Sequence, residues 1–288
     1  MMANDERKLL IGLTGAGIAR SLSPAMHEEE ARCHGIRLHY QLIELDHIAA
    51  GSAALPQLLD TAAQMGFAGV NITFPCKQSV IPLLDELAES ARDLGAVNTV
   101  VYRDGKKIGH NIDASGWAWA FQRAMPAADL SRVALLGAGG AGAAIAHAAL
   151  RLGLKKLIVV DSMPNKAVEL VAQLRQFYGD RALTMPNVAD ALKGASGLIH
   201  ATPTGMHKLP GLALPVTLLQ PTLWVAEVVY FPLETELLRA ARAVGCTTLD
   251  GGGMAVAQAA GAFALFTGAT PDIARMEAHF RRLVARAS

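Results

Sequence analysis

The chain has 288 residues, of which 52% are hydrophobic and 18% are charged, and its formal net charge is +1. This length suits two domains, the composition argues against disorder, and the near-neutral charge disfavours nucleic acid or a membrane surface as a partner. The three cysteines are far apart, and neither they nor the histidines match a metal-ligand spacing. We therefore expect a cytoplasmic protein with no disulfide, no metal site and no transmembrane helix.

In the first part of the chain predicted strands alternate with predicted helices, which is typical of an α/β domain. We expect this domain to span residues 1–113. A helix is predicted to start at Ser23-Pro24, with the serine as N-cap and the proline in the first position. Strands are predicted over residues 8–13, 38–45, 69–73, 97–102 and 107–111, the last two as a hairpin. Further helices are predicted over 53–65 and, as one or two pieces, over 81–94.

A second domain is predicted over residues 114–251, beginning with a helix over 114–125. Its strands are expected near residues 133–136, 157–160, 197–201, 223–229 and 247–249. Its other helices are expected after residue 139 and over 188–192 and 235–244. Residues 252–288 contain no strand candidate and are predicted to form helices broken at Gly268 and Pro271.

A glycine-rich turn follows the strand that starts at Val133. Gly137, Gly139 and Gly142 match the G-x-G-x-x-G spacing, and a helix and another strand follow, which is the context this motif requires. The first glycine allows a tight turn, the second lets the backbone approach a pyrophosphate, and the third lets the helix pack against the strand. The residues expected to hold a dinucleotide here are Gly137, Ala138, Gly139, Gly140, Ala141 and Gly142.

An acid ends the next predicted strand and bears on which dinucleotide binds. Asp161 lies 19 residues after Gly142, and no arginine occurs among the ten residues that follow it. A carboxylate at this position can accept hydrogen bonds from the adenosine ribose hydroxyls and would repel a 2′-phosphate. The sequence therefore predicts NAD rather than NADP.

Polar residues that could act on a substrate lie just after predicted strands, where open α/β sheets place their ligands. Lys77 could relay the proton of a reacting alcohol, and Asp113 could hold it by a charge-assisted hydrogen bond. Ser21 and Ser23 could bind a carboxylate beside a helix N-terminus. The alternative for Ser23 is that it only caps the helix.

Seven motifs occur in the order seen in the shikimate dehydrogenase family, and the chain resembles this family from about residue 10 to residue 280. The motifs are Ser21 to His27, Asn71 to Lys77, Gly95 to Thr99, Gly109 to Asp113, Gly137 to Gly142, Ala201 to Met206 and Gly253 to Gln258. The stretch from Val228 to Leu238, and Asp161 in place of the family's NADP-binding segment, look most like the NAD-dependent quinate/shikimate dehydrogenase branch.

The resemblance implies a substrate domain, a Rossmann domain with a doubly wound parallel sheet, and terminal helices that return to the first domain. It implies Lys77 and Asp113 as the catalytic pair, with substrate bound in a cleft between the domains. The substrate-binding residues would be Ser21, Ser23, Thr73, Asn98, Tyr230 and Gln258. Besides the glycine turn and Asp161, the cofactor residues would be Thr202, Pro203, Met206, Val228 and Gly251.

These expectations describe an NAD-dependent enzyme, a monomer or homodimer, that oxidises quinate or shikimate. Two departures leave the acid open. Ile112 stands where the family usually has a threonine near a substrate hydroxyl, and Ser23 stands where some quinate-preferring relatives have threonine. One alternative is a dehydrogenase of aminoshikimate or another quinate-like acid. The other is an NAD-binding regulatory protein without turnover, against which the presence of both Lys77 and Asp113 argues.

Overall fold

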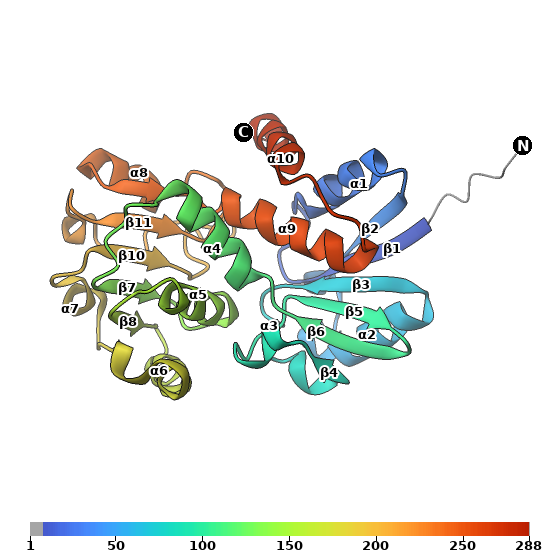
Figure 1. Cartoon of the computed structure of the whole chain (residues 1–288), viewed down its shortest axis with the longest axis horizontal. Helices are drawn as coiled ribbons and strands as arrows, with labels where there is room; N and C mark the ends of the chain where they lie inside the picture. Colours follow the sequence, from blue (N-terminus) through green and yellow to red (C-terminus); the bar gives the residue numbers. More distant parts are fainter. Residues whose placement is uncertain (1–7, 288) are drawn as a thin grey trace, which may run out of the picture. The chain divides into compact units, whose positions relative to one another are not determined.

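The computed structural model describes residues 8–287 and divides the chain into two compact units (Figure 1). Unit 1 contains the described residues up to Ile112 and those from Val256 onward, and unit 2 is Asp113–Ala255. Within these residues each unit has its own six-stranded sheet and its own hydrophobic core. Unit 1 is therefore built from two separate stretches of the chain.

The sheet of unit 1 is mixed and has the strand order β2-β1-β3-β5-β6-β4. Its strands are β1 (Lys8–Gly15), β2 (Arg37–Glu44), β3 (Phe67–Ile72), β4 (Glu86–Leu87), β5 (Thr99–Arg103) and β6 (Lys106–His110). The first three run parallel, and β5 is antiparallel to both β3 and β6. Asp104 and Gly105 both have positive φ, 52° and 74°, as a two-residue hairpin turn of this twist requires.

Two glycines allow close packing of the helix over residues 252–267 within unit 1. A Cβ at Gly69 would lie 2.4 Å from Phe266 Cε1, and one at Gly261 would lie 2.5 Å from Ile112 Cγ2. The helices that contribute to this unit are α1 (Ser23–Cys33), α2 (Leu55–Gln64), α3 (Glu89–Arg92), α9 (Gly252–Thr267, whose first residues belong to unit 2) and α10 (Ile273–Ala287). Short 3-10 turns span Leu45–His47, Gly51–Ala54 and Ile81–Leu83.

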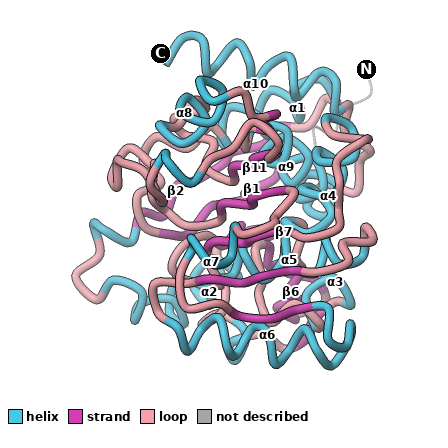
Figure 2. Tube along the Cα trace, turned by 90° about the vertical axis from the view of Figure 1, so that its left-hand side faces the viewer, coloured by secondary structure: helices cyan, strands magenta, loops and turns pink. Residues whose placement is uncertain are grey.

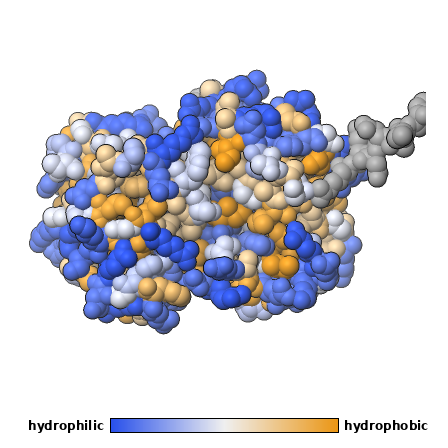
Figure 3. Space-filling model, in the orientation of Figure 1, coloured by the Kyte–Doolittle hydropathy of each residue, from blue (hydrophilic) through white to orange (hydrophobic). Residues whose placement is uncertain are grey.

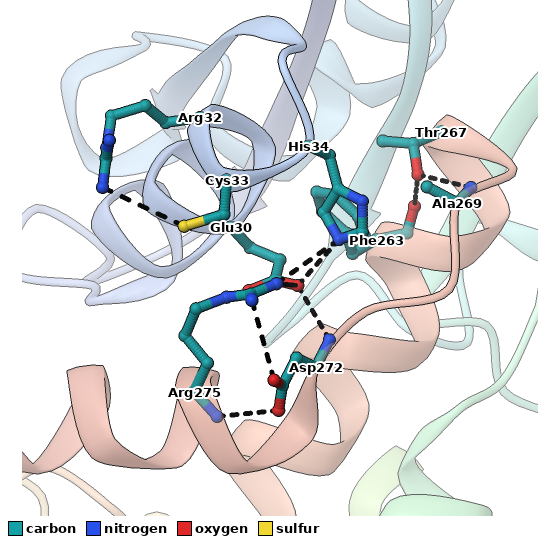
Figure 4. Close-up of polar contacts among 9 residues, drawn as sticks. All are labelled: Glu30, Arg32, Cys33, His34, Phe263, Thr267, Ala269, Asp272 and Arg275. Carbon is teal, nitrogen blue, oxygen red and sulfur yellow. Dashed lines mark hydrogen bonds and ion pairs between the residues drawn. The ribbon is translucent and has the colours of Figure 1, made fainter.

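A buried ion pair joins α10 to α1 within unit 1 (Figure 4). The Glu30 side chain is 1% exposed, and Arg275 donates to both of its carboxylate oxygens, from Nε at 2.8 Å and from Nη2 at 2.6 Å. The backbone N–H of Asp272 donates to the same carboxylate at 2.8 Å, and His34 Nε2 lies 3.0 Å from it. Burial opposes the charged form of Glu30, but these partners hold the pKa of Glu30 below its ordinary value.

The sheet of unit 2 is parallel throughout and has the order β12-β11-β10-β7-β8-β9. Its strands are β7 (Val133–Leu136), β8 (Leu157–Val160), β9 (Ala182–Thr184), β10 (Gly197–His200), β11 (Trp224–Glu227) and β12 (Thr247–Leu249). Its helices are α4 (Asp113–Ala124), α5 (Gly140–Arg151), α6 (Pro164–Tyr178), α7 (Val188–Leu192) and α8 (Glu236–Val244), with 3-10 turns at Gly179–Arg181 and Val216–Leu218.

The residues of β7 show that helices cover both faces of this sheet (Figure 2). Val133 and Leu135 belong to one apolar cluster, with residues of α5 and α6, whereas Ala134 and Leu136 belong to another, with residues of α7 and α8. The strand order reverses between β7 and β10, and ligands of such sheets bind beyond the carboxyl ends of the strands at that point. The α/β class expected from the sequence, with a Rossmann-type sheet, is confirmed.

Three local predictions were wrong or incomplete. Ser23 does not cap α1, because it is the first helical residue and Leu22 takes the cap position. Residues 81–94 contain only a 3-10 turn, β4 and the short α3, since pairing of β4 with β6 overrides the helical pattern. The helix α6 and the strand β9 were missed.

The face of the molecule that Figure 3 shows has a mixed surface. Hydrophilic and hydrophobic residues are interspersed on the face that Figure 3 shows. Within residues 8–287 no helix is both long and apolar enough to cross a membrane.

Candidate functional site

The glycine turn after β7 has the geometry of a phosphate cradle. Gly137 has φ +103°, and a Cβ at Gly142 would lie 1.9 Å from Gly137 O, so the third glycine of the motif is needed for packing. A Cβ at Gly139 would meet nothing within 4 Å, so open space lies beside the second glycine. Gly139 is the N-cap of α5 and supplies no side chain to the amides of the first turn. The turn therefore fits a dinucleotide pyrophosphate.

Asp161 is fixed beside this turn by backbone hydrogen bonds. Its carboxylate accepts from Ala138 N at 2.7 Å and from Met163 N at 2.8 Å, which joins the end of β8 to the glycine turn. A hollow of about 270 Å³ lies next to the aspartate and has mainly apolar walls. The hollow is lined by Asp161, Pro164, Ala167, Val168, Thr184, Met185 and Pro186. Apolar walls with one polar group are typical of small-molecule sites, so the hollow is a candidate for an adenosine group.

Other predicted cofactor residues follow the neighbouring strands of unit 2. A Cβ at Gly137 would lie 2.7 Å from Ala201 O and 3.1 Å from Thr202 Cγ2, so the turn after β7 touches the loop after β10. A Cβ at Gly251 would lie 2.6 Å from Val228 O. Pro203 and Met206 lie in the same loop as Thr202, and Met206 N donates to Pro203 O at 3.2 Å. The structure thus places these residues at the carboxyl ends of the strands.

A buried polar cluster behind this loop was not found by sequence reasoning. His200 Nδ1 lies 2.8 Å from Glu227 Oε1, and His200 Nε2 lies 2.5 Å from Thr202 Oγ1. Thr235 Oγ1 donates to Glu227 Oε2 at 3.0 Å. The available signal was that His200 and Glu227 are polar residues near the ends of two predicted strands, over residues 197–201 and 223–229.

In unit 1 the structure brings Ser21 and Ser23 together. Ser21 Oγ donates to Ser23 Oγ at 3.1 Å and accepts from Ser23 N at 3.3 Å. The preceding loop is held by Glu44, whose carboxylate accepts from the N–H groups of Gly17, Ile18 and Ala19 at 2.7 to 2.9 Å. Glu44 was missed by sequence reasoning, although it is an acid at the end of the strand beside β1.

Thr73, Lys77 and Asn98 lie near the ends of the neighbouring strands. Thr73 N donates to Thr14 O at 3.0 Å, and Val97 N donates to Lys77 O at 2.8 Å. The side chain of Asn98 has a defined orientation, because its Oδ1 accepts from Thr99 Oγ1 and from Ile112 N, both at 3.0 Å. The loop from Thr73 to Lys77 is therefore attached to both β1 and the residue before Asn98.

The remaining predicted substrate residues are divided between the units. Asp113 is 2% exposed and is the first residue of α4 and of unit 2, which also contains Tyr230. Gln258 lies on α9 in unit 1 and is partly exposed. The pairing of Lys77 with Asp113 stays a prediction. Ile112 is 9% exposed and belongs to an apolar cluster with Phe266.

Family models match both ends of the chain. The shikimate dehydrogenase substrate binding domain matches residues 13–100, and the shikimate 5′-dehydrogenase C-terminal domain matches residues 251–279. A shikimate dehydrogenase (NADP(+)) of Streptomyces avermitilis is 54% identical over 282 residues, which cover 97% of each chain. The chain belongs to the shikimate dehydrogenase family. It is therefore an oxidoreductase of a family whose members use a nicotinamide cofactor.

Members named for the other dinucleotide are also similar. A quinate/shikimate dehydrogenase (NAD(+)) of Corynebacterium glutamicum is 44% identical over 279 residues, which cover 96% of this chain and 99% of the relative. The solved structure of quinate dehydrogenase from Corynebacterium glutamicum in complex with NAD has a TM-score of 0.87 and 44% identity, and covers 96% of this chain and 99% of that one. Membership of the family therefore does not distinguish NAD from NADP, and the residues of the site have to be considered.

Proposed function

We propose that the protein is an NAD-dependent quinate/shikimate dehydrogenase. It would reversibly oxidise a ring alcohol of a cyclic hydroxy acid, turning quinate into 3-dehydroquinate and shikimate into 3-dehydroshikimate. The observation that carries this proposal is the pairing of the glycine turn with a fixed acid, Asp161, at the end of β8. The similarity to NAD-dependent quinate/shikimate dehydrogenases supports it.

Lys77 moves the proton in this proposal. The bound nicotinamide supplies the acceptor for the hydride that leaves the alcohol carbon. During oxidation the unprotonated amine of Lys77 takes the hydroxyl proton, and during reduction the ammonium returns it to the carbonyl oxygen. Asp113 orients Lys77 and the reacting hydroxyl, because a buried carboxylate makes strong charge-assisted hydrogen bonds.

Ser21 and Ser23 bind the substrate carboxylate in this proposal. The two hydroxyls lie 3.1 Å apart at the start of α1, where the helix dipole favours a negative group. Glu44 holds the loop before them, so the serine pair is pre-organised. Thr73, Asn98, Tyr230 and Gln258 would bind the ring hydroxyls or the carboxylate.

Asp161 favours NAD because its carboxylate would repel a 2′-phosphate and accept from a free ribose hydroxyl. In this proposal the pyrophosphate of the dinucleotide would bind at residues 137–142, and its adenosine would lie in the hollow beside Asp161. The name of the relative from Streptomyces avermitilis states the opposite preference, so the cofactor is the decisive measurement.

The test is a matrix of initial rates with NAD or NADP and with quinate, shikimate or aminoshikimate. We expect kcat/KM to be at least about tenfold higher with NAD, and Asp161→Asn to narrow that difference. A preference for NADP in the unaltered protein would refute the cofactor assignment. Turnover of aminoshikimate alone would favour that alternative, and no turnover of any acid would favour a dinucleotide-binding regulator.

A further inference from the structure

We propose that Glu227, His200 and Thr202 form a buried chain of hydrogen bonds that positions the loop after β10, residues 202–206, beside the nicotinamide. The same chain makes the Thr202 hydroxyl an acceptor towards the bound dinucleotide. His200 and Glu227 are then positioning residues, and Thr202 is the residue that contacts the cofactor. The inference rests on the proposed function for the identity of the ligand. It assigns a role to two buried residues that the hydride and proton transfers do not use.

The carboxylate of Glu227 is the fixed end of this chain. Its side chain is 0% exposed, and it accepts from Val228 N at 2.9 Å, from Val229 N at 3.0 Å and from Thr235 Oγ1 at 3.0 Å. These donors come from the segment after β11 and from the N-cap of α8. A buried carboxylate with so many donors has one stable orientation, because moving it would leave several polar groups unpaired.

The imidazole of His200 transmits this orientation to the loop. Both oxygens of Glu227 lie near His200 Nδ1, at 2.8 and 3.0 Å, so we assign the proton to Nδ1, which donates to the carboxylate. In the neutral tautomer Nε2 is then an acceptor, and the Thr202 hydroxyl donates to it across 2.5 Å. The Thr202 oxygen also accepts from Thr204 N at 3.3 Å.

This assignment of protons determines whether the Thr202 hydroxyl donates to a ligand or accepts from it. Because the single hydroxyl proton of Thr202 is used by His200, the oxygen can only accept from a ligand. A carboxamide N–H of a nicotinamide is a donor of the matching kind. The same cluster also supports the far end of the loop, since a Cβ at Gly205 would lie 3.4 Å from Thr235 Cβ.

Two substitutions of His200 separate its hydrogen bond to Glu227 from its hydrogen bond to Thr202. Asparagine places an amide nitrogen near the position of Nδ1, so His200→Asn keeps a donor to Glu227 and loses the partner of Thr202. Glutamine places its amide near the position of Nε2, so His200→Gln keeps an acceptor for Thr202 and leaves Glu227 without that donor. If His200 positions the loop, the asparagine variant should be the more stable of the two, and the glutamine variant should bind the cofactor more tightly.

Calorimetry with NAD and with ADP-ribose measures the role without any substrate or turnover. We expect His200→Asn to weaken NAD binding about tenfold while ADP-ribose binding is unchanged. We expect His200→Gln to bind NAD nearly as the unaltered protein does but to have the lower Tm of the two. If loss of NAD affinity follows loss of Tm, or if ADP-ribose is lost equally, the cluster is only structural and the proposal is wrong.

A second pair of variants keeps the buried residues intact. Thr202→Val removes the hydroxyl and should reproduce the tenfold loss for NAD but not for ADP-ribose, whereas Thr202→Ser should restore NAD binding. Equal NAD affinity in the valine and serine variants would overturn the proposal. Should the unaltered protein bind NADP instead, NADP and 2′-phospho-ADP-ribose replace the two ligands, so an error in the cofactor assignment is distinguished from an error in this inference.

Discussion

His27 is a buried imidazole surrounded by aromatic rings in unit 1. It is 1% exposed, its ring centroid lies 4.9 Å from that of Tyr40, and its Nδ1 has no partner among the described residues. Desolvation lowers the pKa of His27 from 6.5 to about 3. The folded protein therefore holds this residue neutral at a pH where the unfolded chain would protonate it.

The stability contributed by neutral His27 is present above pH 6.5 and is lost as the pH falls, because only the unfolded state then binds the proton. Between pH 7 and pH 5 this loss should reach about 2 kcal/mol. Urea unfolding at both pH values checks it, with His27→Leu as the variant that cannot titrate. The leucine variant should lose about 2 kcal/mol less over the same interval. An unchanged pH dependence would show that His27 is not held neutral.

A substitution of Lys77 tests the proposed proton transfer. Lys77→Ala should lower kcat by about 10² to 10⁴-fold, since general acid–base catalysis contributes that much, while dinucleotide binding survives. Stopped-flow turnover and calorimetry with the dinucleotide measure the two effects separately. Turnover close to that of the unaltered protein would reject the role of Lys77.

Single residues differ in how far the sequence alone identifies them. The sequence singles out Lys77, Asp113 and the serine pair as candidates because each follows a predicted strand within a local motif, and their roles stay predictions. Glu44, His200 and Glu227 could not be predicted, because their partners come from other segments, such as Glu44 with Gly17 and His200 with Glu227. Only the register of neighbouring strands brings these groups together.

Among the elements, the turn between β7 and α5 shows why two glycines of one motif are not equivalent. Gly142 faces Gly137 O, whereas Gly139 faces open space and has an ordinary φ of −75°. Packing therefore requires a glycine at position 142, whereas the open space beside Gly139 would admit the proposed ligand. The spacing in the sequence predicts both roles, and the structure shows the close contact that underlies the packing role of Gly142.

Matched alanine variants separate these requirements. Gly142→Ala should lower Tm and abolish dinucleotide binding, because its Cβ would lie 1.9 Å from Gly137 O. Gly139→Ala should leave the free energy of unfolding within about 0.5 kcal/mol and still weaken the dinucleotide about tenfold or more. Thermal unfolding and calorimetry distinguish the outcomes. A Gly139→Ala variant that binds normally would place the pyrophosphate away from this turn.

Elements with strong local patterns were predicted well, and elements defined by distant pairing were not. The buried strands β7 and β8 and the hairpin of β5 and β6 read directly from apolar runs and turn residues. Residues 81–94 have a helical pattern, yet β4 pairs there with β6, whose residues lie about 20 positions later. The start of α1 also differs, since Leu22 O, not Ser23, begins the helical hydrogen bonds.

Unit 1 depends on contacts between its two stretches of chain. Glu30 on α1 and Arg275 on α10 are one such contact, and Phe266 on α9 is another, because it lies against Gly69 of β3. The family models matched at residues 13–100 and 251–279 fall mainly on these two stretches.

Removing one partner of the buried pair should destabilise unit 1 more than removing both charges. Arg275→Met keeps the aliphatic stem but leaves Glu30 charged and without its main donor, so we expect Tm to fall by several degrees. The double variant Glu30→Gln with Arg275→Met should recover part of that loss. Calorimetric unfolding checks both, and equal Tm values for Arg275→Met and the unaltered protein would contradict the expected dependence on this pair.

The division of unit 1 into two stretches also sets an order for its formation during synthesis. The ribosome completes residues 113–255, the whole of unit 2, before it delivers α10 and most of α9. At common translation rates the first 112 residues wait about ten to thirty seconds for those helices. During that interval Gly69 and Ile112 lack the helix that packs against them in the finished protein. Unit 2 can thus be folded while unit 1 is still unfinished, although unit 1 starts at the earlier end of the chain.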